Sequence, residues 1–201
     1  MNREEKNSLM YGRILDSALH EFSRNGYAAA SINAICKRGG LSKGIVYHYF
    51  ETKEALYLAC ADDCFQKLTR FLEQHIPPAE LSAQQQLEAY FRARLSFFEE
   101  NPHFQKLFCE VLMLPPESLA YELKSLRNDF DTFNAALLRR ILTGVRLRPG
   151  LSAEEALLLI TQLQDSINAS RRAGVSISEH EEHTRQLLDI FLFGMAARDE
   201  H

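Results

Sequence analysis

The sequence predicts an all-α protein with a small N-terminal head and a larger helical body. Apolar residues recur at helical spacing along the chain, while the alternation typical of strands is scarce. Glycine and proline pairs divide the chain into segments of helical length. The 201 residues are 46% hydrophobic and 25% charged, which is the composition of a folded globular protein. We therefore expect a helical protein of one or two compact domains.

The first 55 residues are predicted to form a head of three helices. The first helix has an apolar stripe and ends at Gly26. The stripe consists of Ile14, Leu15, Ala18, Leu19 and Phe22. Ser31 is expected to cap a second helix over residues 32–38, and Gly39-Gly40 ends it. Ser42 is expected to cap a third helix over residues 43–50.

The remaining helices are predicted to form the body. Thr52 is expected to cap a fourth helix over residues 53–75, which Pro77-Pro78 ends. Five further helices are expected over residues 82–100, 103–113, 117–145, 152–173 and 178–197. This pattern gives about nine helices, with a DNA-binding domain at residues 1–55 and an effector-binding and dimerisation domain at residues 56–201.

The third helix is predicted to read DNA. Together with the second helix and the turn between them it has the size of a helix-turn-helix. Val46 and Phe50 are expected to face inward, which leaves an outward face at the helix start. That face consists of Lys43, Gly44, Ile45, Tyr47 and His48. Lysine ammoniums, tyrosine hydroxyls and helix N-termini are groups that bind phosphates.

The charge distribution agrees with a nucleic-acid-binding head on an acidic body. The net charge of the chain is −4, yet residues 1–55 hold eight basic and six acidic side chains. The remaining residues hold fifteen basic and twenty-one acidic side chains. A local positive field is sufficient to attract a polyanion.

Three motifs in the head carry a family resemblance. They are FSRNGY at residues 22–27, SINAIC at residues 31–36 and GLSKGIVYHYFETKEAL at residues 40–56. With these motifs, residues 11–60 resemble the DNA-binding head of the TetR/AcrR family of transcriptional regulators. The sequence departs from the family pattern at Asn33, where an arginine is common, and at Cys36, where alanine is usual.

The resemblance implies roles for individual residues of the head. Ser42, Tyr47 and Lys53 are expected to contact phosphates. Lys43, Gly44, Ile45 and His48 are expected to face base edges. Among these, Lys43 matches a guanine edge and Ile45 matches a thymine methyl group.

The resemblance also implies a homodimer that binds a palindromic operator in double-stranded DNA. The last two helices would pair with those of a second subunit. The expected interface residues are Leu159, Leu163, Ile167, Leu188 and Phe191. An ordinary intrachain core is the alternative for these residues.

A small-molecule effector site inside the body is a further implication of the resemblance. The expected lining residues are Phe91, Phe98, Phe108, Tyr121, Phe130, Asn134, Gln164 and Asn168. The aromatic walls favour a largely apolar effector, and the acidic body favours a neutral or cationic one. Each polar residue of this set has the alternative role of a satisfied structural group.

The sequence favours a ligand-responsive repressor that is not an enzyme and has no cofactor. It contains no phosphate-binding glycine-rich loop, no HExxH and no Gly-x-Ser-x-Gly motif. The alternatives are a helical adaptor module without DNA binding, or an activator or nucleoid-associated protein without an effector.

Localisation and cysteine chemistry follow from simpler features. No apolar run reaches the roughly 20 residues that span a bilayer, and the N-terminus lacks the features of a secretory signal. We therefore expect a cytoplasmic protein with no membrane partner and no metal site.

Cys60 and Cys64 lie one helical turn apart, which leaves a redox or metal pair open, although reduced core cysteines are favoured.

Overall fold

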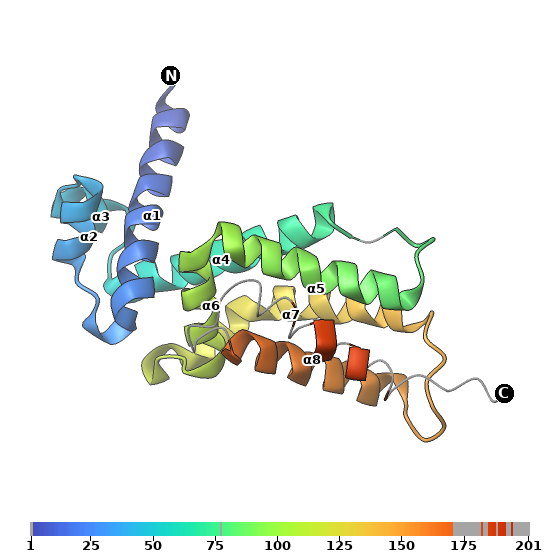
Figure 1. Ribbon diagram of the computed structural model, residues 1–201. Helices are drawn as coiled ribbons and strands as arrows, with labels where there is room; N and C mark the ends of the chain where they lie inside the picture. Colours follow the sequence, from blue (N-terminus) through green and yellow to red (C-terminus); the bar gives the residue numbers. More distant parts are fainter. Residues whose placement is uncertain are drawn as a thin grey trace. The chain divides into compact units, whose positions relative to one another are not determined.

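A computed structural model describes residues 2–76 and 78–170, together with helical residues 182, 185–187, 189–191 and 194. Within these residues the chain forms eight α-helices and a 3₁₀ turn, without a β-strand, which confirms the all-α prediction (Figure 1). The chain divides into two compact units. The first comprises residues 1–67 and 100–128, and the second comprises residues 68–99 and 129–201.

Helix α1 (Arg3–Ala29) is the longest element of the first unit. It begins with a reciprocal cap, in which the Asn2 side chain accepts from the Glu5 N–H at 2.7 Å and the Glu5 carboxylate accepts from the Asn2 N–H at 2.8 Å. The predicted apolar stripe is buried. At Gly26 the backbone leaves the helical region with φ 72° and ψ 167°, and one further turn follows before the helix ends at Ala29. The predicted end at Gly26 is therefore a break inside the element.

Helices α2 (Ile32–Gly39) and α3 (Lys43–Tyr49) complete the helix-turn-helix, and both lie next to α1 in the first unit (Figure 1). The Ser42 hydroxyl accepts a hydrogen bond from the Ile45 N–H at 3.2 Å, which confirms the predicted cap of α3. Ser31 occupies the cap position of α2, but its side chain makes no cap bond. Its N–H instead donates to the Glu21 carboxylate of α1 at 3.1 Å.

The first unit also contains most of α4 (Lys53–Gln74), α6 (Pro102–Met113), the 3₁₀ turn η1 (Glu117–Leu119) and the start of α7 (Ala120–Leu142). Thr52 caps α4 by accepting from the Ala55 N–H at 3.1 Å. The single helix predicted over residues 117–145 is therefore a 3₁₀ turn followed by α7. The segment between α6 and α7 contains two prolines, at which a regular helix ends.

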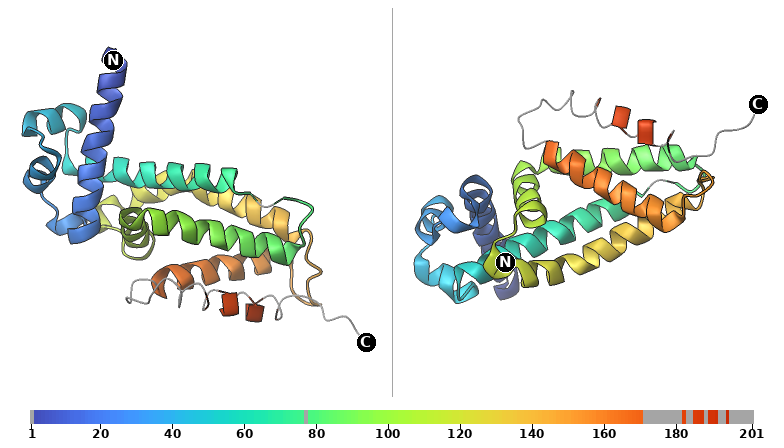
Figure 2. Two further views of the ribbon diagram at one scale, coloured as in Figure 1. Left: turned by 45° about the horizontal axis from the view of Figure 1, so that its top comes forward. Right: turned by 90° about the horizontal axis from the view of Figure 1, so that it is seen from below.

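The second unit contains the end of α4, α5 (Ala83–Glu100), most of α7 and α8 (Ala153–Ser170). Figure 2 shows these helices running alongside one another as a bundle. The Phe71 and Phe97 rings join α4 to α5 with centroids 5.5 Å apart. Apolar side chains from all four helices fill the core, including Leu72, Leu87, Phe91, Leu138, Ile141 and Ile160. Packing of these faces stabilises helices that would be marginal alone.

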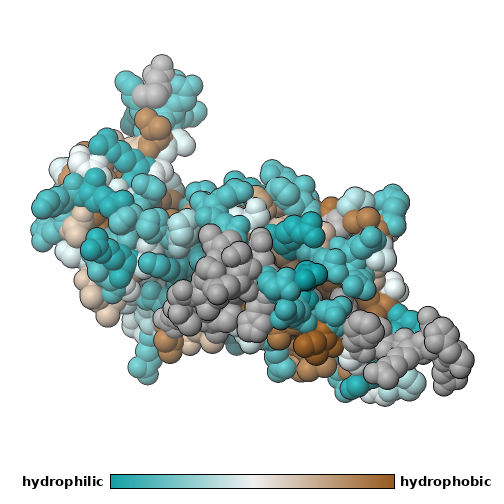
Figure 3. Space-filling model, in the orientation of Figure 1, coloured by the Kyte–Doolittle hydropathy of each residue, from teal (hydrophilic) through white to brown (hydrophobic). Residues whose placement is uncertain are grey.

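The predicted helix over residues 178–197 lies mostly outside the described residues, and the division at residue 55 remains a prediction. Among the described residues, no helix combines the length and apolar character needed to cross a bilayer. Figure 3 shows a face on which hydrophilic colouring predominates over the described surface, with separate small hydrophobic areas. Scattered exposed apolar side chains of this kind are normal on protein surfaces.

Candidate nucleic-acid interface

Helix α3 has one buried anchor and a broad exposed face. Val46 is fully buried, and Phe50, directly after the helix, is also buried. The five residues predicted to face outward are all exposed in the structure, namely Lys43, Gly44, Ile45, Tyr47 and His48. The predicted sorting of the two faces is therefore confirmed. It follows from the 3.6-residue period of the helix.

The N-terminal half of α1 supports the far end of α3. The Tyr49 hydroxyl donates a hydrogen bond to the side chain of Asn7. The Tyr11 ring lies 5.2 Å from the Phe50 ring and 6.3 Å from the Tyr49 ring, measured between centroids. These contacts hold the C-terminal end of α3, whereas the outward residues Lys43 to Ile45 lie at its N-terminal end.

Two consecutive glycines position α3 relative to α1. At Gly39 a Cβ atom would lie 2.6 Å from the Ser17 hydroxyl oxygen, so any other residue there would force the neighbouring side chains to shift where α2 approaches α1. Gly40 adopts φ 59°, the left-handed conformation that ends α2, and the Leu41 N–H then donates to the Cys36 carbonyl at 2.9 Å. Sequence reasoning treated the pair only as a helix stop, because the contact with Ser17 depends on tertiary packing.

Lys53 lies where α1 ends and α4 begins, and its ammonium makes contacts within the protein. It donates to the carbonyls of Tyr27 at 2.9 Å, Ala30 at 3.3 Å and Ala28 at 3.4 Å. It also lies 4.6 Å from the centroid of the Tyr27 ring. In this structure Lys53 therefore ties the last turn of α1 to α4. Its contact with a DNA phosphate remains a prediction. To make that contact, the Lys53 ammonium would have to give up some of its hydrogen bonds to these carbonyls.

The Tyr27 hydroxyl extends the same junction. It donates to the Glu54 carboxylate at 2.6 Å. Burial, followed by the Glu54 carboxylate, raises the pKa of Tyr27 to about 12, and the Tyr27 hydroxyl lowers the pKa of Glu54. The junction therefore holds a protonated tyrosine and an ionised glutamate at neutral pH.

Comparison with known proteins identifies the head. The sequence model described as "Bacterial regulatory proteins, tetR family" matches residues 14–60, which run from within α1 to the start of α4 and include all of α2 and α3. The head of this chain matches the TetR family.

Curated relatives that share the head of this chain are described as transcriptional regulators. The HTH-type transcriptional regulator UidR of Escherichia coli K12 is 47% identical over 62 residues, which cover 30% of this chain and 32% of UidR. RutR of Escherichia coli O157:H7 is 33% identical over 121 residues, which cover 56% of this chain and 54% of RutR. The chain thus spans about half, or less, of the length of these relatives.

Solved structures share the fold over nearly the whole chain. FadR from Bacillus subtilis, solved in complex with stearoyl-CoA, superposes with a TM-score of 0.74 at 19% identity, covering 92% of this chain and 98% of FadR. The regulatory protein TetR from Rhodobacter sphaeroides superposes with a TM-score of 0.72 at 16% identity, covering 94% and 100% of the two chains. At these identities the likeness concerns the fold alone.

The residues predicted to line an effector site are divided by the structure. Phe91, Phe98, Phe130, Asn134 and Gln164 are buried in the second unit. Phe108 is buried in the first unit instead, and the side chain of Asn168 lies outside the described residues. Tyr121 was wrongly placed in this set. It is 83% exposed at the start of α7, because the buried face of that turn is formed by Leu119 and Leu123.

A buried polar cluster in the second unit was missed. The Tyr90 hydroxyl of α5 donates to the Asn134 side chain of α7 and accepts from the Gln164 amide of α8. Asn134 also donates to Gln164 at 3.3 Å, and Arg94 donates to the Tyr90 hydroxyl at 3.3 Å. Burial raises the pKa of Tyr90, so this group stays a neutral hydrogen-bonding hydroxyl. Asn134 and Gln164 thus act here as hydrogen-bonded structural groups, which was the alternative to their predicted contact with an effector.

The predicted interface residues have different environments within the protomer. Leu159 is 38% exposed, Leu163 and Phe191 are half-buried, and Leu188 lies outside the described residues. Ile167 is only 5% exposed and therefore lies in the protomer's own core. Sequence reasoning missed Leu158, which is 58% exposed, whereas Ile190, which is 70% exposed, lies in the second helix expected to pair. Whether an apolar side chain is exposed depends on the fold, so it cannot be predicted from hydrophobicity alone.

The cysteines behave as core residues. All four are buried, and none is in a disulfide bond. The Cys60 thiol donates to the Leu15 carbonyl and the Cys64 thiol to the Phe104 carbonyl, each at 3.8 Å. Burial raises the pKa of both thiols, which keeps them protonated and unreactive. Among the described residues, no group of three or more His, Cys, Asp and Glu side chains is arranged to hold a metal ion.

Proposed function

We propose that this chain is a transcriptional regulator of the TetR family that binds operator DNA through the exposed face of α3. The observation that carries the proposal is the pairing of a buried Val46 with exposed Lys43, Ile45 and Tyr47 on a two-turn helix at the surface. A helix of this kind presents donors and an apolar side chain to the major groove while its core side holds it rigid. Ser42, Tyr47 and Lys53 are assigned to phosphates, and Lys43, Gly44, Ile45 and His48 to base edges.

We propose further that the regulator works as a homodimer on a palindromic operator. Exposed Leu158 and Leu159 on α8 supply an apolar surface of the type that subunit interfaces bury. A two-fold pair of heads would place two copies of α3 on half-sites about one helical turn apart, roughly 34–36 Å.

The regulatory part of the proposal is a repressor that a small molecule releases. The stearoyl-CoA complex of Bacillus subtilis FadR supports a ligand-binding role for the body of this fold. In the present chain, Phe91, Phe98 and Phe130 together with Asn134 and Gln164 are the candidates for contact with a largely apolar effector. Release requires that the effector bind one conformation better than the other.

A salt titration tests DNA binding against the adaptor alternative. A fluorescent random duplex is titrated with the protein, and anisotropy is followed at 50 and 200 mM salt. A DNA-binding regulator should lose affinity steeply as salt rises, because each phosphate contact releases counterions. An adaptor would show no salt-sensitive binding, and that result would reject the proposal. Lys124→Ala, which removes an exposed lysine of α7 far along the chain from α3, is the control and should retain normal binding.

A further inference from the structure

The last turn of α1 is separated from the rest of the helix by the break at Gly26. The backbone leaves the helical conformation there, and a new turn begins at Tyr27. The Ala30 N–H donates to the Gly26 carbonyl at 3.1 Å and closes this turn. N–H groups at the start of a helical turn have no acceptor within that turn. The turn over residues 27–30 therefore takes an acceptor from another part of the chain.

A carboxylate of α6 supplies that acceptor. The Tyr27 N–H donates to Glu110 Oε1 at 3.0 Å. The two oxygens of Glu110 also lie 3.7 and 3.9 Å from the position that a Cβ would take at Gly26. Burial, and after it the Glu110 carboxylate, raise the pKa of the Tyr57 hydroxyl, which places α4 beside the same carboxylate. Glu110 therefore lies where α1, α4 and α6 meet in the first unit.

The opposite end of the same turn is held by α4. The Lys53 ammonium donates to the carbonyls of Tyr27, Ala28 and Ala30. The turn thus has a carboxylate at its N–H end and an ammonium at its carbonyl end, which are the signs of charge that helix termini favour. Removing the carboxylate would leave the Tyr27 N–H without this acceptor at a part-buried junction.

The turn over residues 27–30 lies next to the helices on both sides of α3. Ser31 follows the turn directly and occupies the cap position of α2, which precedes α3 in the chain. Lys53 is the first residue of α4, which follows α3 after a short link. A change in the direction of this turn would therefore move both attachments of α3 together.

We propose that Glu110 is a positioning residue for DNA reading, because its bond to the Tyr27 N–H fixes the turn at which α2 and α4 begin and so orients α3. This role rests on the proposed function of α3. Glu110 lies outside the residues 14–60 that match the family model, and it acts on α3 through the turn without touching DNA.

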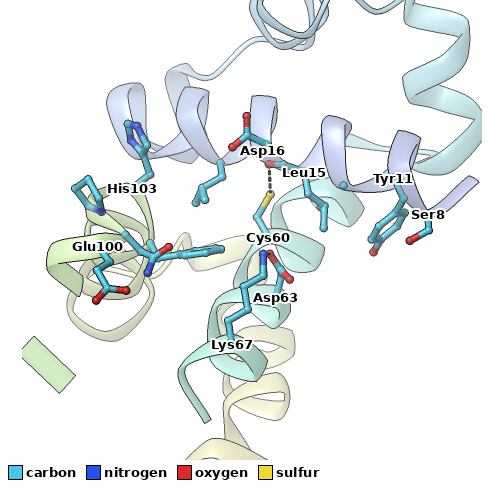
Figure 4. Close-up of a pocket in the computed structure, with 14 residues that line it drawn as sticks. Ser8, Tyr11, Leu15, Asp16, Cys60, Asp63, Lys67, Glu100 and His103 are labelled. Atoms are coloured by element: carbon cyan, nitrogen blue, oxygen red, sulfur yellow. Dashed lines mark hydrogen bonds and ion pairs between the residues drawn. The ribbon is translucent and has the colours of Figure 1, made fainter. Parts of the chain in front are cut away.

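Other contacts hold α6 and α4 on α1 without Glu110. The Ser23 hydroxyl oxygen lies 2.8 Å from Nδ1 of His103. Around the pocket drawn in Figure 4, His103 of α6 lies beside α1, and the Cys60 thiol of α4 donates to the Leu15 carbonyl of α1. Replacing Glu110 should therefore leave the three helices packed and change the turn that its carboxylate holds.

The test compares Glu110→Ala with Glu110→Gln, whose amide oxygen still accepts from the Tyr27 N–H. Anisotropy measures the affinity for a random duplex and for an operator that the unmodified protein selects from a randomised library. Glu110→Ala should reduce the ratio of operator to random affinity about tenfold, because base readout depends on the orientation of α3 more than phosphate contacts do. Glu110→Gln should retain the ratio. No loss in Glu110→Ala, or an equal loss in both variants, would overturn the proposal.

Ser23→Ala is the matched control, because it removes another part-buried hydrogen bond between α1 and α6. It should leave the affinity ratio unchanged. If Ser23→Ala reduces the ratio as much as Glu110→Ala does, with circular dichroism showing intact helices in both, the effect belongs to the docking of α6 in general, and the role of Glu110 is refuted.

Amide resonances of the free protein separate this role from DNA binding itself. Glu110→Ala should accelerate hydrogen exchange at the Tyr27 N–H about tenfold and shift the Ile45 amide of α3, whereas Glu110→Gln should do neither. If these amides respond but the unmodified protein binds no duplex, the positioning of α3 by Glu110 stands and the proposed function fails. If the Ile45 amide does not respond to Glu110→Ala, the positioning role is wrong at any DNA affinity.

Discussion

Val46 and Tyr47 are consecutive residues of α3, yet one is buried and the other is exposed. Val46 is 0% exposed, whereas Tyr47 is 47% exposed. The step of about 100° per residue turns Tyr47 away from the side on which Val46 packs against the head. The valine fixes the helix to the head while the tyrosine hydroxyl stays available to an external acceptor, so the two residues allow stability and DNA binding to be tested separately.

Substitutions on the exposed face should affect binding without affecting folding. Tyr47→Phe removes one hydroxyl and should weaken binding to all duplex sequences alike, by about 1–2 kcal/mol, because only a phosphate contact is lost. Lys43→Ala should cost about 1–3 kcal/mol on the operator and relax base preference at one position of each half-site. Anisotropy on operator and mismatched duplexes measures both effects. Normal operator affinity in both variants, with unchanged melting temperature, would refute the assignment of α3.

Gly39→Ala should destabilise the head. The added Cβ would lie 2.6 Å from the Ser17 hydroxyl oxygen and 2.7 Å from a Leu41 methyl carbon. Overpacking of this kind costs about 1–3 kcal/mol, which exceeds the helix propensity of about 1 kcal/mol gained with alanine. Urea unfolding measures the difference, and we expect a net loss of about 1–2 kcal/mol.

Gly12→Ala is the matched control for this prediction. A Cβ at Gly12 meets nothing within 4 Å, so alanine there should stabilise α1 by about 0.5–1 kcal/mol. The double variant Gly39→Ala with Ser17→Ala should recover part of the loss, because the closest contact is removed. Equal stability of the two single glycine variants would contradict the close packing of α2 on α1.

Tyr57→Phe should leave stability unchanged or raise it. The Tyr57 ring is fully buried against Phe22 and Tyr27, and its hydroxyl makes no hydrogen bond of good geometry among the described residues. Burial, and after it the nearby Glu110 carboxylate, raise the pKa of Tyr57, so Glu110 is the acceptor that the hydroxyl would use. Removing a buried hydroxyl without a well-formed hydrogen bond costs little and relieves its desolvation penalty. We expect a change in unfolding free energy between zero and about 1 kcal/mol of stabilisation. A loss above about 1 kcal/mol would show that the hydroxyl is bonded in solution.

Stability should fall as the pH decreases below 6.5. The His20 and His103 rings lie 4.3 Å apart between α1 and α6, and burial is the main cause that lowers the pKa of each. Arg24, Arg38 and Lys106 add to the lowering, while Asp16 opposes it at both rings and Glu21 opposes it at His20. The unfolded state therefore takes up protons first, at its ordinary pKa of 6.5, and the folded state loses stability from there down to the lowered values.

Melting temperatures measured between pH 5 and 7.5 test this dependence. The lowered pKa of Glu54 acts below its ordinary value of 4.5, outside this window. The double variant His20→Gln with His103→Gln should have a flatter slope than the unmodified protein over the same range. Identical slopes in the two proteins would show that the pair does not titrate on unfolding.

The exposed leucines of α8 should mediate dimerisation. Leu158→Glu would bury an unpaired charge in the proposed interface, and we expect a folded monomer where the unmodified protein is a dimer. Leu158→Met keeps the apolar surface and should remain dimeric. Light scattering separates the two species, and a monomeric unmodified protein would reject the proposed interface.

Local signals were predictable from the sequence because they involve neighbours within one helical turn. Ser42 and Thr52 bond to N–H groups three residues ahead, as capping chemistry requires. The burial of Val46 beside an exposed Tyr47 follows the helical periodicity. The matched motifs lie in this same region, which is why the head was recognisable.

Contacts between distant segments were not predictable in the same way. The ammonium of Lys53 bonds to carbonyls 23 to 26 residues earlier in the chain, and Gly39 packs against Ser17 of a different helix. Tyr121 belongs to an aromatic-rich region but faces outward, since the face that α7 buries depends on its packing partners. The cluster around Tyr90 joins α5, α7 and α8, and no spacing within one helix reveals it.

The most direct test of the account is selection of binding sites from a randomised duplex library by the unmodified protein, with Lys43→Ala processed in parallel. We predict enrichment of a palindrome whose half-sites lie about one helical turn apart, roughly 34–36 Å, and loss of preference at one position per half-site in the variant. Recovery of random sequences by the unmodified protein, or of the same site with unchanged preference by Lys43→Ala, would contradict the claim that α3 reads DNA.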